Sequence, residues 1–227
     1  MRRVITLCFA LSVFATWSSF ARSANLDISV CRDIKGFLYT YTEGEVFNMF
    51  RNDAMKRGVP KTLKDFKEKI DIVPEVYLTK RDKQILRGYK LSRRTGTVIG
   101  AILFVQGNGM LAEQVIPHLT KLLDDGYDIF VYNYRGYGIE AKSEGEPYLK
   151  AIVDDYLELS SQEILKKYNL KLLYGVSFGA IVAANVLGAR APFNKAVLDS
   201  PLSTLESYNC PEQYWPVNVV PKDAKEM

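Results

Sequence analysis

A serine between two glycines is the residue with the clearest potential for chemistry in this chain. Residues 175–179 read Gly-Val-Ser-Phe-Gly, and the short run 171–174 before them is suited to a strand. A G-x-S-x-G pattern between a strand and a helix is typical of a nucleophile elbow, the turn that exposes a reactive serine. The apolar residues 180–187, ended by Gly188, supply the expected helix. The pattern predicts that Ser177 is a nucleophile, and a serine in an ordinary turn is the alternative.

The segments around this serine alternate between strands and helices from residue 74 onward. An antiparallel strand pair is predicted over 76–78 and 85–91, and the continuous apolar run 98–105 predicts a strand buried on both faces. Alternation of this kind implies an α/β fold with a mostly parallel sheet and helices on both faces. The remaining predicted strands cover 127–132, 171–174 and 195–198, and the predicted helices cover 113–123, 149–165 and 180–187.

The residues before this domain follow a different pattern. Apolar side chains recur at helical spacing in two groups, which are separated by the helix-breaking run Gly58-Val-Pro60. The first group is Val46, Phe47, Phe50 and Ala54, and the second is Leu63, Phe66 and Ile70. We therefore expect a helical N-terminal extension over 24–73 and the main domain over 74–227.

The first 23 residues have the pattern of an export signal. Arg2 and Arg3 precede an apolar run over 4–20, and small residues then allow cleavage after Ala21 or Ser23. A periplasmic or secreted protein is the prediction, and an uncleaved membrane anchor is the alternative, because the run is near the lower length limit of a span. Removal of the signal leaves Cys31 and Cys210, which we expect to be free thiols, with a disulfide as the alternative.

Composition narrows the classes of function. The chain has 227 residues, 48% of them apolar, and its net charge of +4 is spread over mixed-sign runs. No basic block alternates with aromatic residues, so we expect no nucleic-acid partner. The sequence has no cluster of metal-ligating residues, so we expect no metal. We also expect no cofactor, and the run 107–109 lacks the lysine and the spacing of a nucleotide-binding loop. A small molecule or an acyl compound is therefore the class of substrate that we expect.

The loops after the predicted strands carry a family resemblance. They read Tyr134-Arg-Gly-Tyr-Gly138, Ser143-Glu-Gly-Glu-Pro147 and Asp199-Ser-Pro201. Together with the elbow, they resemble the α/β-hydrolase superfamily, and more narrowly its serine aminopeptidase-like and dienelactone-hydrolase-like branch, over residues 74–207. The resemblance implies hydrolysis of an ester, thioester or amide by a nucleophilic serine.

Further site residues follow from the resemblance. The run 106–109, Gln-Gly-Asn-Gly, falls on the loop that often reads His-Gly-x-Gly and lines the oxyanion hole, so the main-chain N–H groups of Asn108 and Phe178 are the expected donors. A plain glycine turn is the alternative. Arg135 is expected to brace its loop, with steering of an anionic substrate as the alternative. Asp199 lies where some relatives carry their acid, although an aspartate that caps a turn is favoured.

The general base is the residue that the sequence does not supply. In this fold the order along the chain is Ser, acid, His, but the single histidine, His118, precedes Ser177 and falls within a predicted helix. We therefore expect an incomplete hydrolase chain that lacks its last strands and is inactive alone. A non-catalytic module for binding or scaffolding is the alternative.

Overall fold

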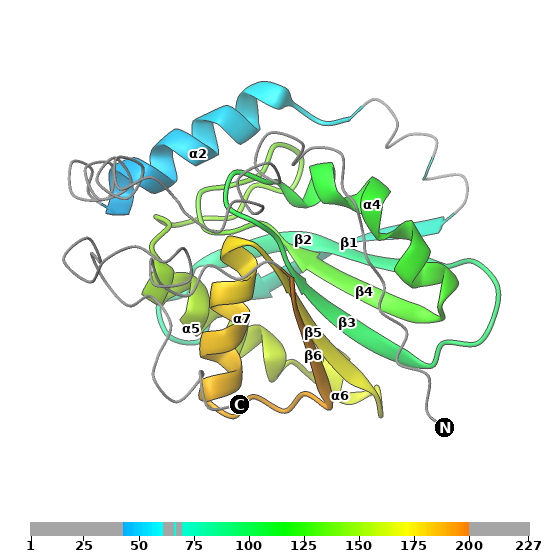
Figure 1. Ribbon diagram of the computed structural model, residues 1–227. Coiled ribbons are helices and arrows are strands. Elements are labelled where there is room, and N and C mark those ends of the chain that lie inside the picture. The colour runs from blue at the N-terminus through cyan, green and yellow to red at the C-terminus, as the bar shows by residue number, and fades with distance from the viewer. Residues whose placement is uncertain (1–42, 61–65, 67–69, 200–227) are drawn as a thin grey trace, which may run out of the picture.

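The computed structural model describes residues 43–60, 66 and 70–199 (Figure 1). The predicted export signal, Cys31 and Cys210 lie outside these residues, as does the second half of the Asp199-Ser-Pro201 turn. None of the helices in the described ranges combines the length and the apolar character that a bilayer crossing requires.

Six strands form one mixed sheet in the order β1-β2-β4-β3-β5-β6. The strands β4, β3, β5 and β6 run parallel, whereas β1 and β2 pair with each other and with β4 in antiparallel fashion. This confirms the predicted mostly parallel sheet. The bounds are Ile70–Leu78 for β1, Ile85–Arg93 for β2, Gly100–Val105 for β3, Tyr127–Tyr132 for β4, Lys171–Val176 for β5 and Lys195–Asp199 for β6.

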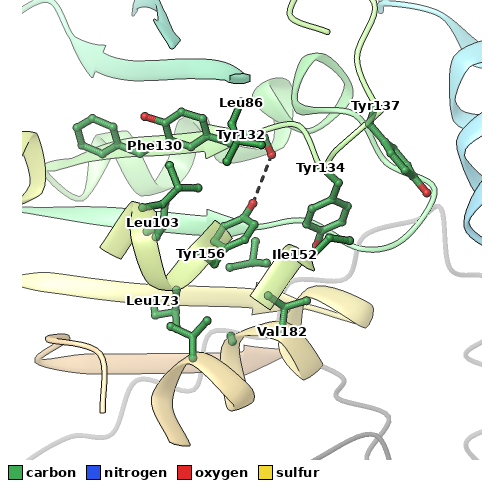
Figure 2. Packing of buried hydrophobic residues seen from close by; sticks show 14 of the residues in the cluster. Leu86, Leu103, Phe130, Tyr132, Tyr134, Tyr137, Ile152, Tyr156, Leu173 and Val182 are labelled. Carbon is green, nitrogen blue, oxygen red and sulfur yellow. Dashed lines mark hydrogen bonds between the residues drawn. The ribbon is translucent and has the colours of Figure 1, made fainter. Parts of the chain in front are cut away.

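Helices cover both faces of the sheet because successive strand residues point to opposite sides. In β3, Ile102 and Phe104 pack in the layer beneath α4, whereas Leu103 and Val105 pack with the helices of the other face. Figure 2 shows the second layer, where Leu103 of β3, Leu173 of β5 and Val182 of α7 lie with several tyrosines. The helices are α2 (Glu43–Arg57), α4 (Ala112–Asp124), α5 (Leu149–Ser160), α6 (Glu163–Lys166) and α7 (Phe178–Gly188).

Two helix predictions were wrong. The helix predicted over 149–165 is two helices, because the hydroxyls of Ser160 and Ser161 both donate to the main-chain oxygen of Leu157, and Gln162 adopts an extended conformation. Side-chain hydroxyls that donate hydrogen bonds to main-chain oxygens of a helix compete with its backbone hydrogen bonds and favour such breaks. Ile70, assigned to a helix by its spacing from Phe66, is instead the first residue of β1. Tertiary pairing with Arg93 of β2 outweighs the local pattern there.

Helix α2 lies across the end of the sheet at which α4 and α7 begin (Figure 1). That end carries the loops that follow β3, β4 and β5, so in an open α/β sheet it is the place where ligands bind.

Candidate active site

The predicted elbow is present at Ser177. Strand β5 ends at Val176 and helix α7 begins at Phe178, so Ser177 alone forms the turn, with φ 53° and ψ −121°. A non-glycine residue with positive φ is strained, at a cost of about 1–3 kcal/mol, and such strain persists where surrounding structure imposes it. The Ser177 N–H donates to the main-chain oxygen of Asp199 at 2.8 Å, which ties the turn to the end of β6.

The two glycines of the pattern are required by close packing. A Cβ on Gly175 would lie 2.3 Å from the main-chain oxygen of Gly179. A Cβ on Gly179 would lie 2.1 Å from the main-chain oxygen of Val105, at the end of β3. Both contacts are with backbone, which cannot rotate away as a side chain can. The elbow therefore allows helix α7 to pack directly against β3 and the loop that follows it.

The 106–109 loop lies beside the serine. A Cβ on Gly107 would lie 3.5 Å from the Cβ of Ser177 and 3.6 Å from the main-chain oxygen of Val176. Phe178 is the first residue of α7, so its N–H has no acceptor within the helix and lies at the positive end of the helix dipole. Phe178 thus directly follows the nucleophile, and Asn108 is next in sequence to Gly107, which lies beside it.

Gln106, the first residue of this loop, anchors it to the neighbouring strand β4. Its side chain is buried, and its amide donates to the main-chain oxygen of Tyr132 at 2.8 Å. The hydroxyl of Tyr134 donates to the main-chain oxygen of Gln106, and the hydroxyl of Tyr156 lies 3.5 Å from the Oε1 of Gln106. The same Tyr156 hydroxyl lies 3.3 Å from the main-chain oxygen of Tyr132 (Figure 2). Burial raises the pKa of Tyr134 and of Tyr156 well above the ordinary value, so both hydroxyls remain donors.

Asn108 is held by its side chain. Its Oδ1 accepts the N–H of Gly109 at 3.0 Å and the hydroxyl of Tyr137 at 2.8 Å. Burial also raises the pKa of Tyr137, so its hydroxyl is protonated at neutral pH. These two contacts fix the residue whose N–H is the predicted oxyanion donor.

Arg135 lies in an ion-pair network rather than in an open site. Its guanidinium donates to both carboxylate oxygens of Asp155 on α5, at 2.6 and 2.5 Å, and to both oxygens of Asp82 in the β1–β2 turn, at 2.6 and 3.1 Å. The side chain is only 4% exposed. Hydrogen bonds with the two aspartates keep the pKa of Arg135 above its usual value despite burial. This arrangement suits a residue that braces the loop after β4, and it leaves few donors for a substrate.

Glu113 is a second loop anchor, and sequence reasoning missed it. Its carboxylate is fully buried on the first turn of α4, and Oε1 accepts the N–H groups of Ile139, Glu140 and Ala141 at 3.0–3.3 Å. Its Oε2 accepts the side-chain amide of Asn133 at 3.0 Å. A charged residue among apolar positions of the predicted helix was the available signal.

The remaining predicted residues occupy different places. Asp199 is the half-buried last residue of β6, opposite Val176 in the register, so its main chain is beside the elbow. His118 lies exposed on α4, one residue after Pro117. Its position gives no support for a role as the general base.

A groove of about 900 Å³ lies between α2 and the loop after β4. Its lining includes Arg51, Arg87 and Lys142, with Glu140, Glu144 and Glu146 interspersed among them. Ser177 is not among the lining residues, so the groove is distinct from the surroundings of the nucleophile.

The comparisons with known proteins agree with this geometry. The sequence profile of the family described as Serine aminopeptidase, S33, matches residues 96–221, which begin after α2, β1 and β2. No curated protein matches the chain in sequence.

Solved structures match the fold over part of their length. The esterase Pf2001 of Pyrococcus furiosus is 22% identical, with a TM-score of 0.52, over 68% of this chain and 62% of that one. An alpha-beta hydrolase from Vibrio vulnificus is 20% identical, with a TM-score of 0.52, over 70% of this chain and 58% of that one. An α/β hydrolase from Penicillium is covered over 46% of its length. At these identities the likeness shows the fold alone, and the chain spans about half to three-fifths of these structures.

Proposed function

Because the chain belongs to the serine aminopeptidase S33 family of α/β-hydrolases, we propose that it carries the nucleophile of a serine hydrolase that cleaves esters, thioesters or amides. One observation carries the proposal above all. Ser177 forms a positive-φ elbow at the start of a helix, directly beside a glycine loop, which is the arrangement that acyl transfer by serine requires.

The proposed reaction has two steps. The Oγ of Ser177 attacks the substrate carbonyl as a base takes its proton, and the resulting oxyanion accepts hydrogen bonds from the N–H groups of Asn108 and Phe178. The intermediate collapses to an acyl-enzyme and releases the protonated alcohol, thiol or amine. Water then attacks the acyl-enzyme, which frees the acid and restores the serine.

The general base that accepts the proton of Ser177 is not assigned to any residue of this chain. No histidine follows Ser177 in the 227 residues, and we do not assign the base to His118. For this chain alone we therefore expect Ser177 to react slowly unless a base is supplied from solution.

Chemical rescue tests the proposal. The chain is incubated with a fluorophosphonate at about pH 8, where added imidazole is mostly neutral, and the modified residue is identified by mass spectrometry. We expect imidazole to accelerate a single modification at Ser177, because it accepts the proton that a family histidine would take.

Two controls define the outcome. Ser177→Ala should abolish the modification, and the exposed Ser161 should remain unmodified in every sample. A folded chain whose Ser177 stays unmodified with and without imidazole would contradict the proposal and favour a non-catalytic binding or scaffold module.

We also propose that the protein is exported to the periplasm or secreted. The support is the pattern of residues 1–23, in which two arginines precede an apolar run and small residues follow it.

A further inference from the structure

Helix α2 precedes the residues that match the family, yet it contacts the candidate oxyanion loop directly. The guanidinium of Arg57 donates to the main-chain oxygen of Gly109, 52 residues along the chain. The ring of Phe50 lies against the same glycine, since a Cβ there would be 3.2 Å from its Cδ1. Gly109 has φ +73°, a backbone conformation that favours glycine, and an added Cβ would press on the Phe50 ring.

Tyr137 joins the helix to the loop. Its hydroxyl lies 3.1 Å from the main-chain oxygen of Phe47 in α2 and 2.8 Å from Oδ1 of Asn108. One hydroxyl thus lies between the helix backbone and the side chain of the predicted oxyanion donor. Phe47 in turn packs edge-on against Phe178, the second predicted donor, with ring centroids 5.3 Å apart.

The C-terminal end of α2, which carries Arg57, also contacts α4. The side-chain amide of Gln114, on the first turn of α4, donates to the main-chain oxygens of Ala54 and Gly58 at 2.8 and 3.0 Å. Its Oε1 accepts the N–H of Leu111 at 3.2 Å, where the oxyanion loop leads into α4. Both ends of the loop are therefore fixed with respect to α2.

We propose that α2 is a strap that holds residues 107–110 in the oxyanion-binding conformation, with Tyr137 and Arg57 as positioning residues. The inference rests on the proposed function, because the loop needs this conformation only if Ser177 is acylated. Donor N–H groups stabilise an oxyanion only when they are aimed at its position, and a misplacement of about 1 Å can cost on the order of 10²-fold in rate.

The test uses one variant in α2 and one in the loop after β4, which contacts α2. Tyr137→Phe removes the hydroxyl that reaches Asn108, and Arg57→Gln removes the guanidinium from Gly109. The side chain of Arg57 is 49% exposed, so this second variant leaves the core intact. Two readouts are made on the full chain. The first is amide hydrogen exchange of Gly109 by NMR. The second is the rate of Ser177 modification in imidazole as a function of fluorophosphonate concentration, which gives a maximal rate and the fluorophosphonate concentration at half-saturation.

Each variant has a matched control. Tyr168→Phe also removes a partly buried tyrosine hydroxyl, which donates to Oδ2 of Asp128 at 2.6 Å, at the start of β4 and the opposite end of the sheet from the oxyanion loop. Asp53→Asn removes the ion-pair partner of Arg57 and leaves the guanidinium free to reach Gly109. Both controls should match the wild type in the two readouts.

The strap predicts a specific combination of results. In Tyr137→Phe and Arg57→Gln, Gly109 exchange should rise about fivefold, as expected for the loss of one hydrogen bond. The maximal rate of modification should fall about tenfold, with the half-saturation concentration unchanged. If Tyr137 and Arg57 contributed only to packing, the maximal rate would not fall selectively at an unchanged half-saturation concentration.

The outcomes are separable from those of the proposed function. Wild-type exchange in both variants would overturn the strap. Faster exchange with an unchanged maximal rate would show that α2 holds the loop without serving the site, which also overturns it. If Ser177 of the wild type is never modified, the proposed function fails, and the Gly109 exchange still decides whether α2 holds the loop.

Discussion

At the scale of single residues, Gly179 sets the strictest demand in the site. A Cβ there would lie 2.1 and 2.5 Å from the main-chain oxygens of Val105 and Gln106. We expect Gly179→Ala to lower the free energy of unfolding by about 3 kcal/mol, the upper end for overpacking, because only backbone movement relieves the clash. Urea denaturation followed by circular dichroism measures the change.

Gly44 provides the control for this substitution. It lies near the start of α2, and an added Cβ would have nothing within 4 Å. Gly44→Ala should therefore be neutral or stabilise by up to about 1 kcal/mol, since alanine is the better helix former. Equal effects of the two alanines would show that the elbow tolerates a side chain.

Asp82 makes the stability sensitive to acid. Hydrogen bonds from Arg135 are the main reason that the pKa of Asp82 lies below its ordinary value of 3.8. A carboxyl whose pKa is lowered by folding stabilises the protein fully above its unfolded-state pKa, and this contribution is lost as the pH falls toward the folded-state pKa.

Asp82→Asn tests this dependence. We expect the variant to be less stable than the wild type between about pH 6 and 7, with the difference shrinking below about pH 4 as the carboxyl takes up a proton in the unfolded wild-type chain. Unfolding by urea at a series of pH values measures it. A difference that stays constant down to about pH 3 would mean that the charge of Asp82 contributes nothing.

At the scale of elements, Glu113 connects α4 to the loop after β4. Its carboxylate accepts three main-chain N–H groups and one side-chain amide in a fully buried position. Glu113→Gln replaces one acceptor oxygen by a donor, so at least one buried N–H loses its partner. We expect a loss of about 1–3 kcal/mol in the free energy of unfolding.

Glu140 is the matched control for Glu113. Its side chain is exposed, so Glu140→Gln keeps the main-chain contacts of the loop and should change the free energy of unfolding by less than about 0.5 kcal/mol. If Glu113→Gln and Glu140→Gln lowered the free energy of unfolding by similar amounts, the buried carboxylate of Glu113 would not be the anchor of this loop.

The elements could be predicted from sequence where the pattern is local. The apolar run 98–105 gave β3, and the glycine-serine pattern gave the turn between β5 and α7. The break at Ser161 was missed because apolar spacing continues across it, and only the hydroxyl contacts with Leu157 interrupt the helix. Ile70 was missed because helical spacing does not register a partner strand 23 residues away.

At the scale of the whole molecule, the parts of the site that the sequence did not predict are those built from distant residues. The Arg135 pairs with Asp82 and Asp155 bridge 53 and 20 residues, and the Tyr137 contact with Phe47 bridges 90. No periodicity or motif encodes such pairs, because each depends on how the sheet orders its strands.

Export is the prediction that concerns the whole chain. If the signal is cleaved, the mature protein should begin at Arg22 or at Ala24, and N-terminal sequencing of the protein from the cell envelope or the medium measures this. Replacement of Arg2 and Arg3 by glutamate should retain the uncleaved precursor in the cell. A mature protein that begins at Met1 and stays with membranes would support the anchor alternative instead.

The position of α2 early in the chain also determines when the site can assemble. Its contact through Tyr137 spans 90 residues, and translation at about 5–20 residues per second adds those residues in roughly 5–20 s. During that interval Phe47, buried in the finished fold, lacks the Tyr137 hydroxyl that contacts its main-chain oxygen and the Phe178 ring that packs against it. Helix α2 is thus made well before Tyr137, which joins it to the oxyanion loop, so chaperones have a defined window in which to bind it.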